Sequence, residues 1–385
     1  MKKSICIFVL LGLFALVVSS CQTHENEQGD VVDLCHPQDV AENQVFSNVQ
    51  VMALEDKDGN YLSNVQELVS EDGYLIVLDS KGVLFVYTAD GKYVSDSKNK
   101  IGHGGNEFSI ITAWTYNRYT KNIEIVTPLH LLSYDIHFNL KKKVKLPTRM
   151  ATNNQKSIIF CHIFDLSENL HILIPTLVSQ DAYTYLLFDS FTSQIVRKYN
   201  FESDAKVDVN MQEQCFFDGK GSEISFVPPF MAQYIYTFDK EMQEFSKKYR
   251  LLFGKDVLTE DDVRKFGDND KQKQSFLLNT DKEIPVSCFD ASEYLAVFMK
   301  KGRKLSDCFT LFYDKSSKQV ARVNQFTDKK MSFPLVKYAD ANCLYASVDG
   351  KALDGILEHL NKQGIKVEAN KQEKGSIYVL KYYLK

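Results

Sequence analysis

The sequence predicts an all-β protein, a six-bladed β-propeller of four-stranded antiparallel blades, and two observations lead to this prediction. The first is a recurring apolar strand that carries an aromatic residue close to a tight turn, with the aromatic residues at positions Tyr87, Tyr134, Phe188, Phe238 and Tyr313. Their spacing is about 50 residues with one longer gap, which is typical of propeller blades. The second is the supply of hairpin turn sequences between the strands, such as Asp72-Gly73 and Asp90-Gly91.

Five blades fit between positions 65 and 326, each with its innermost strand first. The expected strands are 65–71, 74–79, 83–88 and 93–97 in blade one; 110–117, 122–127, 131–135 and 140–146 in blade two; 159–165, 170–176, 183–189 and 195–201 in blade three; 214–218, 224–227, 233–239 and 245–253 in blade four; and 285–290, 294–299, 308–314 and 319–326 in blade five. The longer gap lies between blades four and five. There, Thr259 followed by acidic residues predicts a short helix to about Phe266, and positions 268–273 are expected to be a polar loop.

The sixth blade needs both ends of the chain. Positions 333–340, 343–348 and 376–384 supply three strands, and between them 351–363 has apolar residues on one helical face before Gly364, a common helix stop. The segment 45–54 has the composition of a strand but no partner next to blade one. We therefore expect it to close the ring as the outer strand of the last blade, which protects strand edges from aggregation.

The N-terminus predicts export and a lipid anchor. Lys2 and Lys3 precede an apolar stretch, 5–18, that is too short to span a bilayer comfortably, as in secretory signal peptides. The sequence Val18-Ser19-Ser20-Cys21 resembles the bacterial lipobox, and the resemblance implies cleavage before Cys21 and lipidation of that residue. Plain secretion is the alternative. The expected domains are the lipoprotein signal peptide 1–20, a flexible tether 21–44 and the propeller 45–385.

Charge and cysteine usage exclude some partners. Cleavage before Cys21 would remove Lys2 and Lys3, so the mature chain has 44 basic and 50 acidic residues, and this mild acidity argues against nucleic acid. The basic run at 141–143 is expected to lie on a solvated outer edge. Six further cysteines stand singly, mostly in apolar strands, and we expect free buried thiols.

One loop carries a family resemblance. The sequence Ile101-Gly102-His103-Gly104-Gly105-Asn106-Glu107-Phe108 resembles a motif of six-bladed β-propeller lipoproteins of Bacteroides-type bacteria, which are distant NHL-like relatives. Gly105 and Asn106 replace the proline and glycine of that motif, and both tolerate positive φ. The resemblance implies the fold and a lipoprotein of the outer membrane, facing the periplasm or the cell surface. It implies no activity.

The candidate ligand-facing residues are His103, Glu107, His130 and Arg303, because the inter-blade loops and the second-to-third strand turns share one face of a propeller. The loop 101–108, which contains His103 and Glu107, could be a nest of backbone amides for a ligand. Alternatively, it is an inter-blade turn in which Glu107 caps backbone groups and Phe108 packs between blades. Carboxylates around the funnel could hold calcium, but the sequence has no metal motif and no catalytic motif, so no cofactor and no catalytic residue are assigned.

Two hypotheses of function remain. The first is a non-enzymatic binding or interaction module, expected to be monomeric, with an unknown protein or glycan partner and a membrane contact through its lipid. The second is a hydrolase or lyase with a funnel metal or an acid–base pair such as His103 and Glu107. An enzyme requires titratable groups that converge in one pocket, whereas a binding module requires an exposed apolar or aromatic surface.

Overall fold

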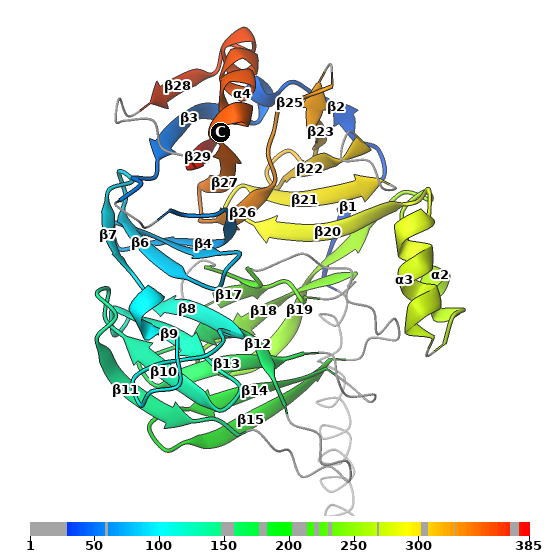
Figure 1. Ribbon diagram of the computed structural model, residues 1–385. Coiled ribbons are helices and arrows are strands. Elements are labelled where there is room, and N and C mark those ends of the chain that lie inside the picture. The colour runs from blue at the N-terminus through cyan, green and yellow to red at the C-terminus, as the bar shows by residue number, and fades with distance from the viewer. Residues whose placement is uncertain are drawn as a thin grey trace, which may run out of the picture.

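Six β-sheets stand around a common axis in the computed structural model, which confirms the prediction of an all-β six-bladed propeller (Figure 1). The structure describes residues 29–57, 61–147, 158–176, 183–201, 214–218, 223–229, 233–267, 269–301, 307–327, 329–369 and 377–385. The expected signal peptide 1–20, Cys21 and Arg303 lie outside these ranges. Within them, no helix is both long enough and apolar enough to cross a membrane.

The first three blades are four-stranded, and each is an antiparallel meander whose strands follow one another from the axis outward. Blade one comprises β4 (Val65–Glu71), β5 (Tyr74–Asp79), β6 (Leu84–Thr88) and β7 (Tyr93–Asp96). Blade two comprises β8 (Ala113–Asn117), β9 (Asn122–Val126), β10 (His130–Tyr134) and β11 (Leu140–Lys145). Blade three comprises β12 (Phe160–Asp165), β13 (Leu170–Pro175), β14 (Tyr183–Asp189) and β15 (Gln194–Phe201).

Blades four and five each gain an outer strand from the N-terminal segment. Blade four comprises β16 (Phe216–Asp218), β17 (Glu223–Phe226), β18 (Tyr234–Asp239) and β19 (Glu244–Leu252), with β1 (Asp30–Asp33) parallel to β19. Blade five comprises β20 (Glu283–Asp290), β21 (Tyr294–Lys301), β22 (Phe309–Asp314) and β23 (Val320–Asn324), with β2 (Gln38–Asp39) parallel to β23.

The expected flexible tether at 21–44 is therefore wrong for its second half. Val32 and Leu34 alternate along the chain and are buried on the propeller, with 1% and 2% of their surface exposed. The short 3-10 helix η1 (Glu42–Gln44) then leads into the closing strand. An edge strand needs apolar residues on one face only, so this segment contains few of them. The polar residues around Val32 and Leu34 therefore make the alternation difficult to recognise in the sequence. The propeller body thus begins near Asp30.

The closing strand lies where it was expected. β3 (Phe46–Ala53) pairs antiparallel with β29 (Ile377–Leu384) in blade six, whose inner strands are β26 (Val336–Ala339) and β27 (Cys343–Asp349). Outside β3 lies a fifth strand that the sequence did not predict, β28 (Lys366–Ala369), parallel to it. Helix α4 (Gly350–Lys362) begins at its N-cap Asp349, which accepts bonds from two backbone amides, and covers the blade.

The insertion between blades four and five is more helical than predicted. Helix α2 (Glu260–Arg264) forms as expected, with Thr259 and Asp262 in a capping box. The expected polar loop is wrong, because helix α3 (Asp270–Asn279) occupies most of it, with Asn269 as its N-cap. Its sequence has little apolar periodicity. The partly buried Phe276 and Leu277 pack against the core. A small hairpin, β24 (Phe326–Thr327) and β25 (Lys330–Met331), was also not predicted.

Basic residues of outer strands tie neighbouring blades together. Lys142 on β11 donates to Asn169 Oδ1 (2.8 Å) and Ser190 Oγ (3.0 Å) in blade three. Lys248 on β19 pairs in the same way with Asp290 of blade five at 2.7 Å. The lysine run of blade two is thus only partly the solvated edge that we expected. The six cysteines in the described ranges form no disulfide, as predicted.

Candidate functional site

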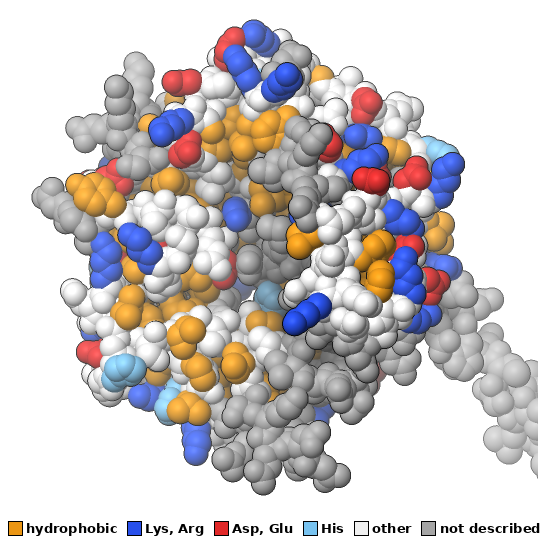
Figure 2. Space-filling view, turned by 45° about the vertical axis from the view of Figure 1, so that its right-hand side comes forward, with side chains coloured by type: hydrophobic (Ala, Val, Ile, Leu, Met, Phe, Trp, Pro, Cys, Tyr) orange, Lys and Arg blue, Asp and Glu red, His pale blue; other side chains and the backbone are white. Residues whose placement is uncertain are grey.

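A cavity of about 660 Å³ lies among the innermost strands, and all six blades contribute to its wall. Figure 2 shows the ring hollowed at its centre. The wall is built mainly from the inner strands β4, β8, β12, β16 and β26 and from the residues that follow β4, β8 and β26. This volume is in the range of small-molecule sites in proteins.

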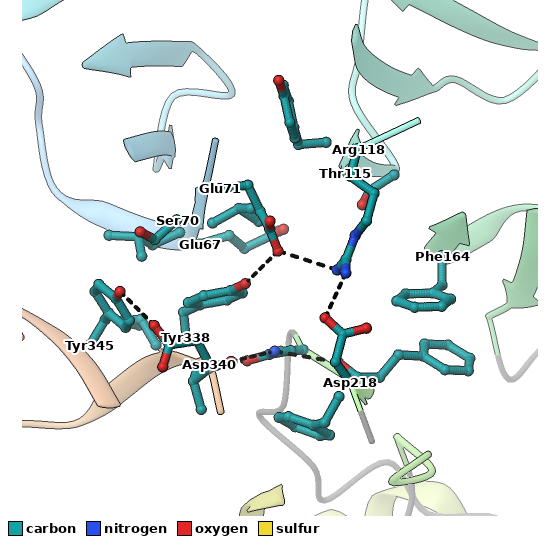
Figure 3. A pocket seen from close by; sticks show the side chains of 18 of the residues that line it. Glu67, Ser70, Glu71, Thr115, Arg118, Phe164, Asp218, Tyr338, Asp340 and Tyr345 are labelled. Carbon is teal, nitrogen blue, oxygen red and sulfur yellow. Dashed lines mark hydrogen bonds and ion pairs between the residues drawn. The ribbon is translucent and has the colours of Figure 1, made fainter. Parts of the chain in front are cut away.

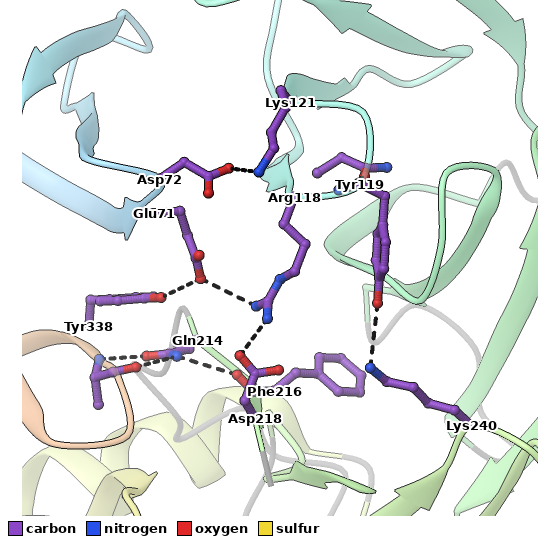
Figure 4. A network of polar contacts seen from close by, with 12 residues as sticks. Glu71, Asp72, Arg118, Tyr119, Lys121, Gln214, Phe216, Asp218, Lys240 and Tyr338 are labelled. Atoms are coloured by element: carbon purple, nitrogen blue, oxygen red, sulfur yellow. Dashed lines mark hydrogen bonds and ion pairs between the residues drawn. The ribbon is translucent and has the colours of Figure 1, made fainter. Parts of the chain in front are cut away.

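Arg118 directly follows β8 and connects three blades across this cavity. Its guanidinium contacts Glu71 of blade one at 3.3 Å and Asp218 of blade four at 2.7 Å (Figure 4). Tyr338 of blade six donates its hydroxyl to the same Glu71 oxygen at 3.2 Å. Gln214 adds a second link, because its amide donates to Ala339 O and accepts from Ala339 N. Four blades therefore meet in one hydrogen-bonded network.

The protonation of this network follows from its burial. Burial raises the pKa of Glu71, and the charge of Arg118 opposes this shift. For Arg118, burial acts to lower the pKa, but the charges of Glu71 and Asp218 outweigh it and raise the pKa. Burial and the charge of Glu71 also raise the pKa of Tyr338 well above its usual value. The Arg118 guanidinium is thus firmly charged, and Tyr338 is a hydroxyl that donates.

Aromatic rings form another part of the wall. The rings of Phe164 and Phe216 stack with centroids 4.6 Å apart, and Phe164 is only half-buried (Figure 3). Lys381 lies over the rings of Tyr345 and Tyr383, at 5.1 Å from each centroid. Trp114 both packs between blades one and two and lines the cavity. The cavity therefore combines apolar ring surface with polar groups.

Two of the predicted residues, His103 and Glu107, lie elsewhere, in the loop between β7 and β8. The inner strands run from such loops to the turn that carries Arg118, so this loop is at the other end of the strand. Glu107 accepts a bond from Gly104 N at 2.8 Å, and a side chain at Gly102 would collide with its carboxylate. Phe108 is 3% exposed and packs against Tyr134. These contacts confirm the interpretation as an inter-blade turn.

His130 lies at the same end as this loop, at the turn between β9 and β10. Burial lowers its pKa, and the charges of Lys143 and Lys145 lower it further. His130 is therefore a neutral imidazole at neutral pH, and its backbone N–H donates to Thr127 Oγ1. The structure does not bring it to the cavity network. Arg303, as stated above, lies outside the described residues.

The sequence analysis missed the residues that do converge, although a signal for them exists. Four inner strands end in an acidic residue, and in blade six Asp340 follows β26 directly. These residues are Glu71, Asp165, Asp218, Asp290 and Asp340. All five line the cavity. An acidic residue at the end of an inner strand is thus a second feature that recurs from blade to blade.

A buried Asp–His–Ser arrangement occurs in blade three. His171 Nδ1 lies 2.6 Å from Asp165 Oδ1, and His171 Nε2 lies 3.0 Å from Ser190 Oγ. His171 and Ser190 are 0% and 3% exposed, and only Asp165 of the three lines the cavity. Since Ser190 also accepts from Lys142, the arrangement fastens β12, β13 and the turn after β14 to blade two. It does not present a nucleophile to a substrate.

Glu124 lies beside this arrangement and predicts a pH dependence of stability. Burial, and secondarily the charge of Asp165, raise its pKa to about 8, although a hydrogen bond from Ser133 and the charge of Lys142 act to lower it. In the unfolded chain the pKa is near 4.5. The native state therefore holds this proton more tightly, and the free energy of unfolding should fall as pH rises from 4.5 to 8, by up to about 1.4 kcal/mol per pH unit.

The variant Glu124→Gln should abolish this slope, because it keeps the acceptor for Ser133 without an ionisable group. Its stability relative to the unmodified chain should increase from pH 5 to pH 8 and then level off, as measured by urea unfolding. Glu358→Gln, at an exposed position on α4, is the control and should show no such trend. A constant difference between Glu124→Gln and the unmodified chain over this pH range would contradict the assignment.

In the described ranges, His, Cys, Asp and Glu side chains form no group of three or more that could hold a metal ion. The arrangement in the cavity is thus one of hydrogen-bond donors, acceptors and ring faces. It can orient a ligand through several directed contacts. We therefore treat the cavity as the candidate functional site.

Comparison with known structures supports the fold. A protein of Bacteroides fragilis NCTC 9343 that is thought to be exported superposes with a TM-score of 0.68 at 15% identity, over 92% of this chain and 99% of that one. A DUF4221 family member from Bacteroides vulgatus ATCC 8482 superposes with a TM-score of 0.52 at 10% identity, over 89% and 97% of the two chains. No curated protein matches this sequence significantly.

A family model described as a domain of unknown function matches residues 30–379, which is nearly the whole propeller and begins where β1 begins. The relation to NHL-like lipoproteins that the loop at 101–108 suggested rests on that resemblance alone. The chain is a member of the DUF4934 family.

Proposed function

We propose that this protein is a lipid-anchored binding module of the cell envelope, without catalytic activity, and that the central cavity is its ligand site. The observation that carries the proposal is the network around Arg118, in which polar side chains from four blades converge on one cavity. Polar groups that are held by their neighbours lose little freedom when a ligand binds, which favours affinity. The superposition with an exported protein agrees with an envelope location.

The anchor would hold the propeller close to the membrane. Cys21 precedes Asp30, the first residue of β1, by nine positions. A fully extended chain of that length spans about 30 Å, much less than the tether to position 44 would. One face or edge of the ring is therefore always near the lipid surface, and the outer membrane remains the proposed location.

The anchor is tested by Cys21→Ser. The unmodified chain should incorporate radiolabelled palmitate in its bacterial host and partition into the detergent phase, because acyl chains bind membranes through their buried methylene groups. Cys21→Ser should lose the label and appear in the soluble envelope fraction. Cys35→Ser, at the next cysteine, is the control and should behave as the unmodified chain. A labelled Cys21→Ser protein would contradict the proposed anchor.

The binding site is tested by obstruction. Thr115 lies on β8 at the cavity wall, so Thr115→Trp would place an indole in the cavity (Figure 3). Thermal unfolding of the full chain in detergent would be followed with a panel of sugars, amino acids, short peptides and organic acids. A ligand at 100 times its Kd should stabilise the chain by about 2.7 kcal/mol. Thr115→Trp should abolish the stabilisation, and Gln319→Trp, at an exposed turn, should retain it.

If no compound stabilises the chain in a manner sensitive to Thr115→Trp, the cavity is not the ligand site. The enzyme alternative has no comparable support, because His103 and Glu107, its suggested acid–base pair, lie in an inter-blade turn where Glu107 is used to cap Gly104.

A further inference from the structure

We infer that the ligand of the central cavity is an uncharged, polyhydroxylated molecule, a neutral oligosaccharide. This inference rests on the proposed function and adds the chemical class of the ligand. It follows from the charge balance of the wall, from the arrangement of donors and acceptors, and from the position of Phe164.

The charge balance disfavours an anion. Seven carboxylates and three cationic side chains of the described chain line the cavity: Glu67, Glu71, Asp72, Asp165, Asp218, Asp290 and Asp340 against Arg118, Lys337 and Lys381. Asp72 is paired with Lys121, and Asp290 with Lys248 and Lys315, all three cations from outside the wall. With these three cations counted, the described groups in and around the wall carry seven negative and six positive charges, a net charge of −1. An anionic ligand would therefore meet a net negative wall of low dielectric.

A cation is disfavoured at the centre by Arg118. Its guanidinium already lies between Glu71 and Asp218, and it would repel a second positive group brought to those two carboxylates. The side chains of Arg118 and Asp218 nevertheless remain 38% and 47% exposed, so both can still contact a ligand. Arg118 uses two nitrogens for its ion pairs and has five N–H donors in all.

Donors and acceptors alternate over a short distance, which suits hydroxyl groups. Arg118 can donate, Asp218 and Glu71 can accept, and a sugar hydroxyl does both at once. Asp340 is held by Tyr345, which donates to it at 2.8 Å, on the blade-six side of the cavity (Figure 3). Pairs of neighbouring hydroxyls match such a network without a charge of their own.

An apolar ring face lies next to this polar network. Phe216 lies on β16 two residues before Asp218, and Phe164 stacks on it from the wall of blade three (Figure 3). Its stacking on Phe216 fixes the ring plane. A pyranose has the same two-sided character, with C–H groups on its faces and hydroxyls around its rim. A wall with a fixed aromatic face and an adjoining row of donors and acceptors therefore matches a sugar ring.

The class is tested by calorimetric titration of the full chain in detergent with maltotriose, cellotriose and mannotriose, and with trigalacturonic acid as the charged counterpart. At least one neutral trisaccharide should bind, and trigalacturonic acid should bind at least tenfold more weakly. Asp218→Asn and Phe164→Leu should each weaken the neutral sugar at least tenfold. The matched controls are Asp354→Asn on α4 and Phe245→Leu on β19, a half-buried ring outside the cavity, and both should bind normally.

Three results would overturn the inference. Tighter binding of trigalacturonic acid than of every neutral trisaccharide would show that the charge balance was misjudged. Neutral binding that is unchanged in both Asp218→Asn and Phe164→Leu would place the sugar elsewhere. If no trisaccharide binds but a peptide or an organic ion stabilises the chain in a manner sensitive to Thr115→Trp, the sugar class is wrong while the proposed ligand site stands.

Discussion

Phe46→Ala should lower the free energy of unfolding by about 3–5 kcal/mol, the usual loss when a buried phenylalanine is truncated. Phe46 begins the closing strand β3 and is 1% exposed. Its ring centroid lies 5.0 Å from that of Tyr382, 5.3 Å from Phe333 and 5.5 Å from Phe312. The substitution therefore leaves a cavity where the closing strand β3, the C-terminal strand β29 and blade five meet.

The midpoint of urea unfolding measures this loss. Phe191→Ala is the matched control, because this phenylalanine is 80% exposed in the turn after β14, and its change should stay within about 0.5 kcal/mol. If Phe46→Ala costs less than 1 kcal/mol, then closure of the ring by β3 contributes far less to stability than its burial indicates.

Asp290→Asn should cost about 2–4 kcal/mol, because it leaves two lysines of the interface between blades four and five without their carboxylate. Lys248 and Lys315 contact Asp290 at 2.7 and 2.6 Å, and its side chain is 1% exposed. The expected loss is at the lower end for buried pairs, because the lysines are 23% and 19% exposed and keep some hydration. Asparagine has nearly the same side-chain volume as aspartate, so the loss in free energy of unfolding measures the effect of removing the charge.

The pH dependence of this loss supplies a second readout. Burial acts to raise the pKa of Asp290, but the two lysines outweigh burial and lower it below 3.8. A carboxylate with a lowered pKa in the native state stabilises the fold fully at pH values above its pKa in the unfolded chain. This stabilisation is lost as the pH falls through the pKa of the native state. The difference between Asp290→Asn and the unmodified chain should therefore be constant from pH 5 to 7 and shrink below pH 4.

A triple variant separates a buried ion cluster from simple packing. Asp290→Leu with Lys248→Met and Lys315→Met removes all three charges and should recover much of the stability that Asp290→Asn loses. A triple variant less stable than Asp290→Asn would show that the apolar replacements do not fill the site. A cost below 0.5 kcal/mol for Asp290→Asn would show that the ion cluster does not hold blades four and five together.

The sequence was sufficient for the architecture because blades repeat. Each hairpin carries its own turn residues, and the missing strand of blade six could be assigned to 45–54 by the need to cover an edge. Elements outside the repeat were harder to predict. Helix α3 lacks an apolar stripe, and the segment 30–34, which contains β1, buries Val32 and Leu34 among polar neighbours. Such segments gain their structure from what they pack against, which local sequence patterns do not contain.

The candidate site could be predicted less well for a different reason. Residues such as His103 and His130 stand out in a sequence because they are titratable and lie at expected turns. Arg118 and Glu71 look like ordinary turn residues until the ring brings blades one, two and four together. Residues 71, 118 and 218 are far apart in the chain, and their convergence is a property of the closed propeller.

The central claim is that the cavity around Arg118 holds a neutral sugar, and a crystal structure of the full chain soaked with the best-binding trisaccharide tests it most directly. We predict electron density for the sugar inside the ring, with hydroxyls within hydrogen-bond distance of Arg118 and Asp218 and a ring face against Phe164. Sugar bound at the loop end near His103 and His130, with the cavity free of sugar at saturating concentration, would contradict the claim.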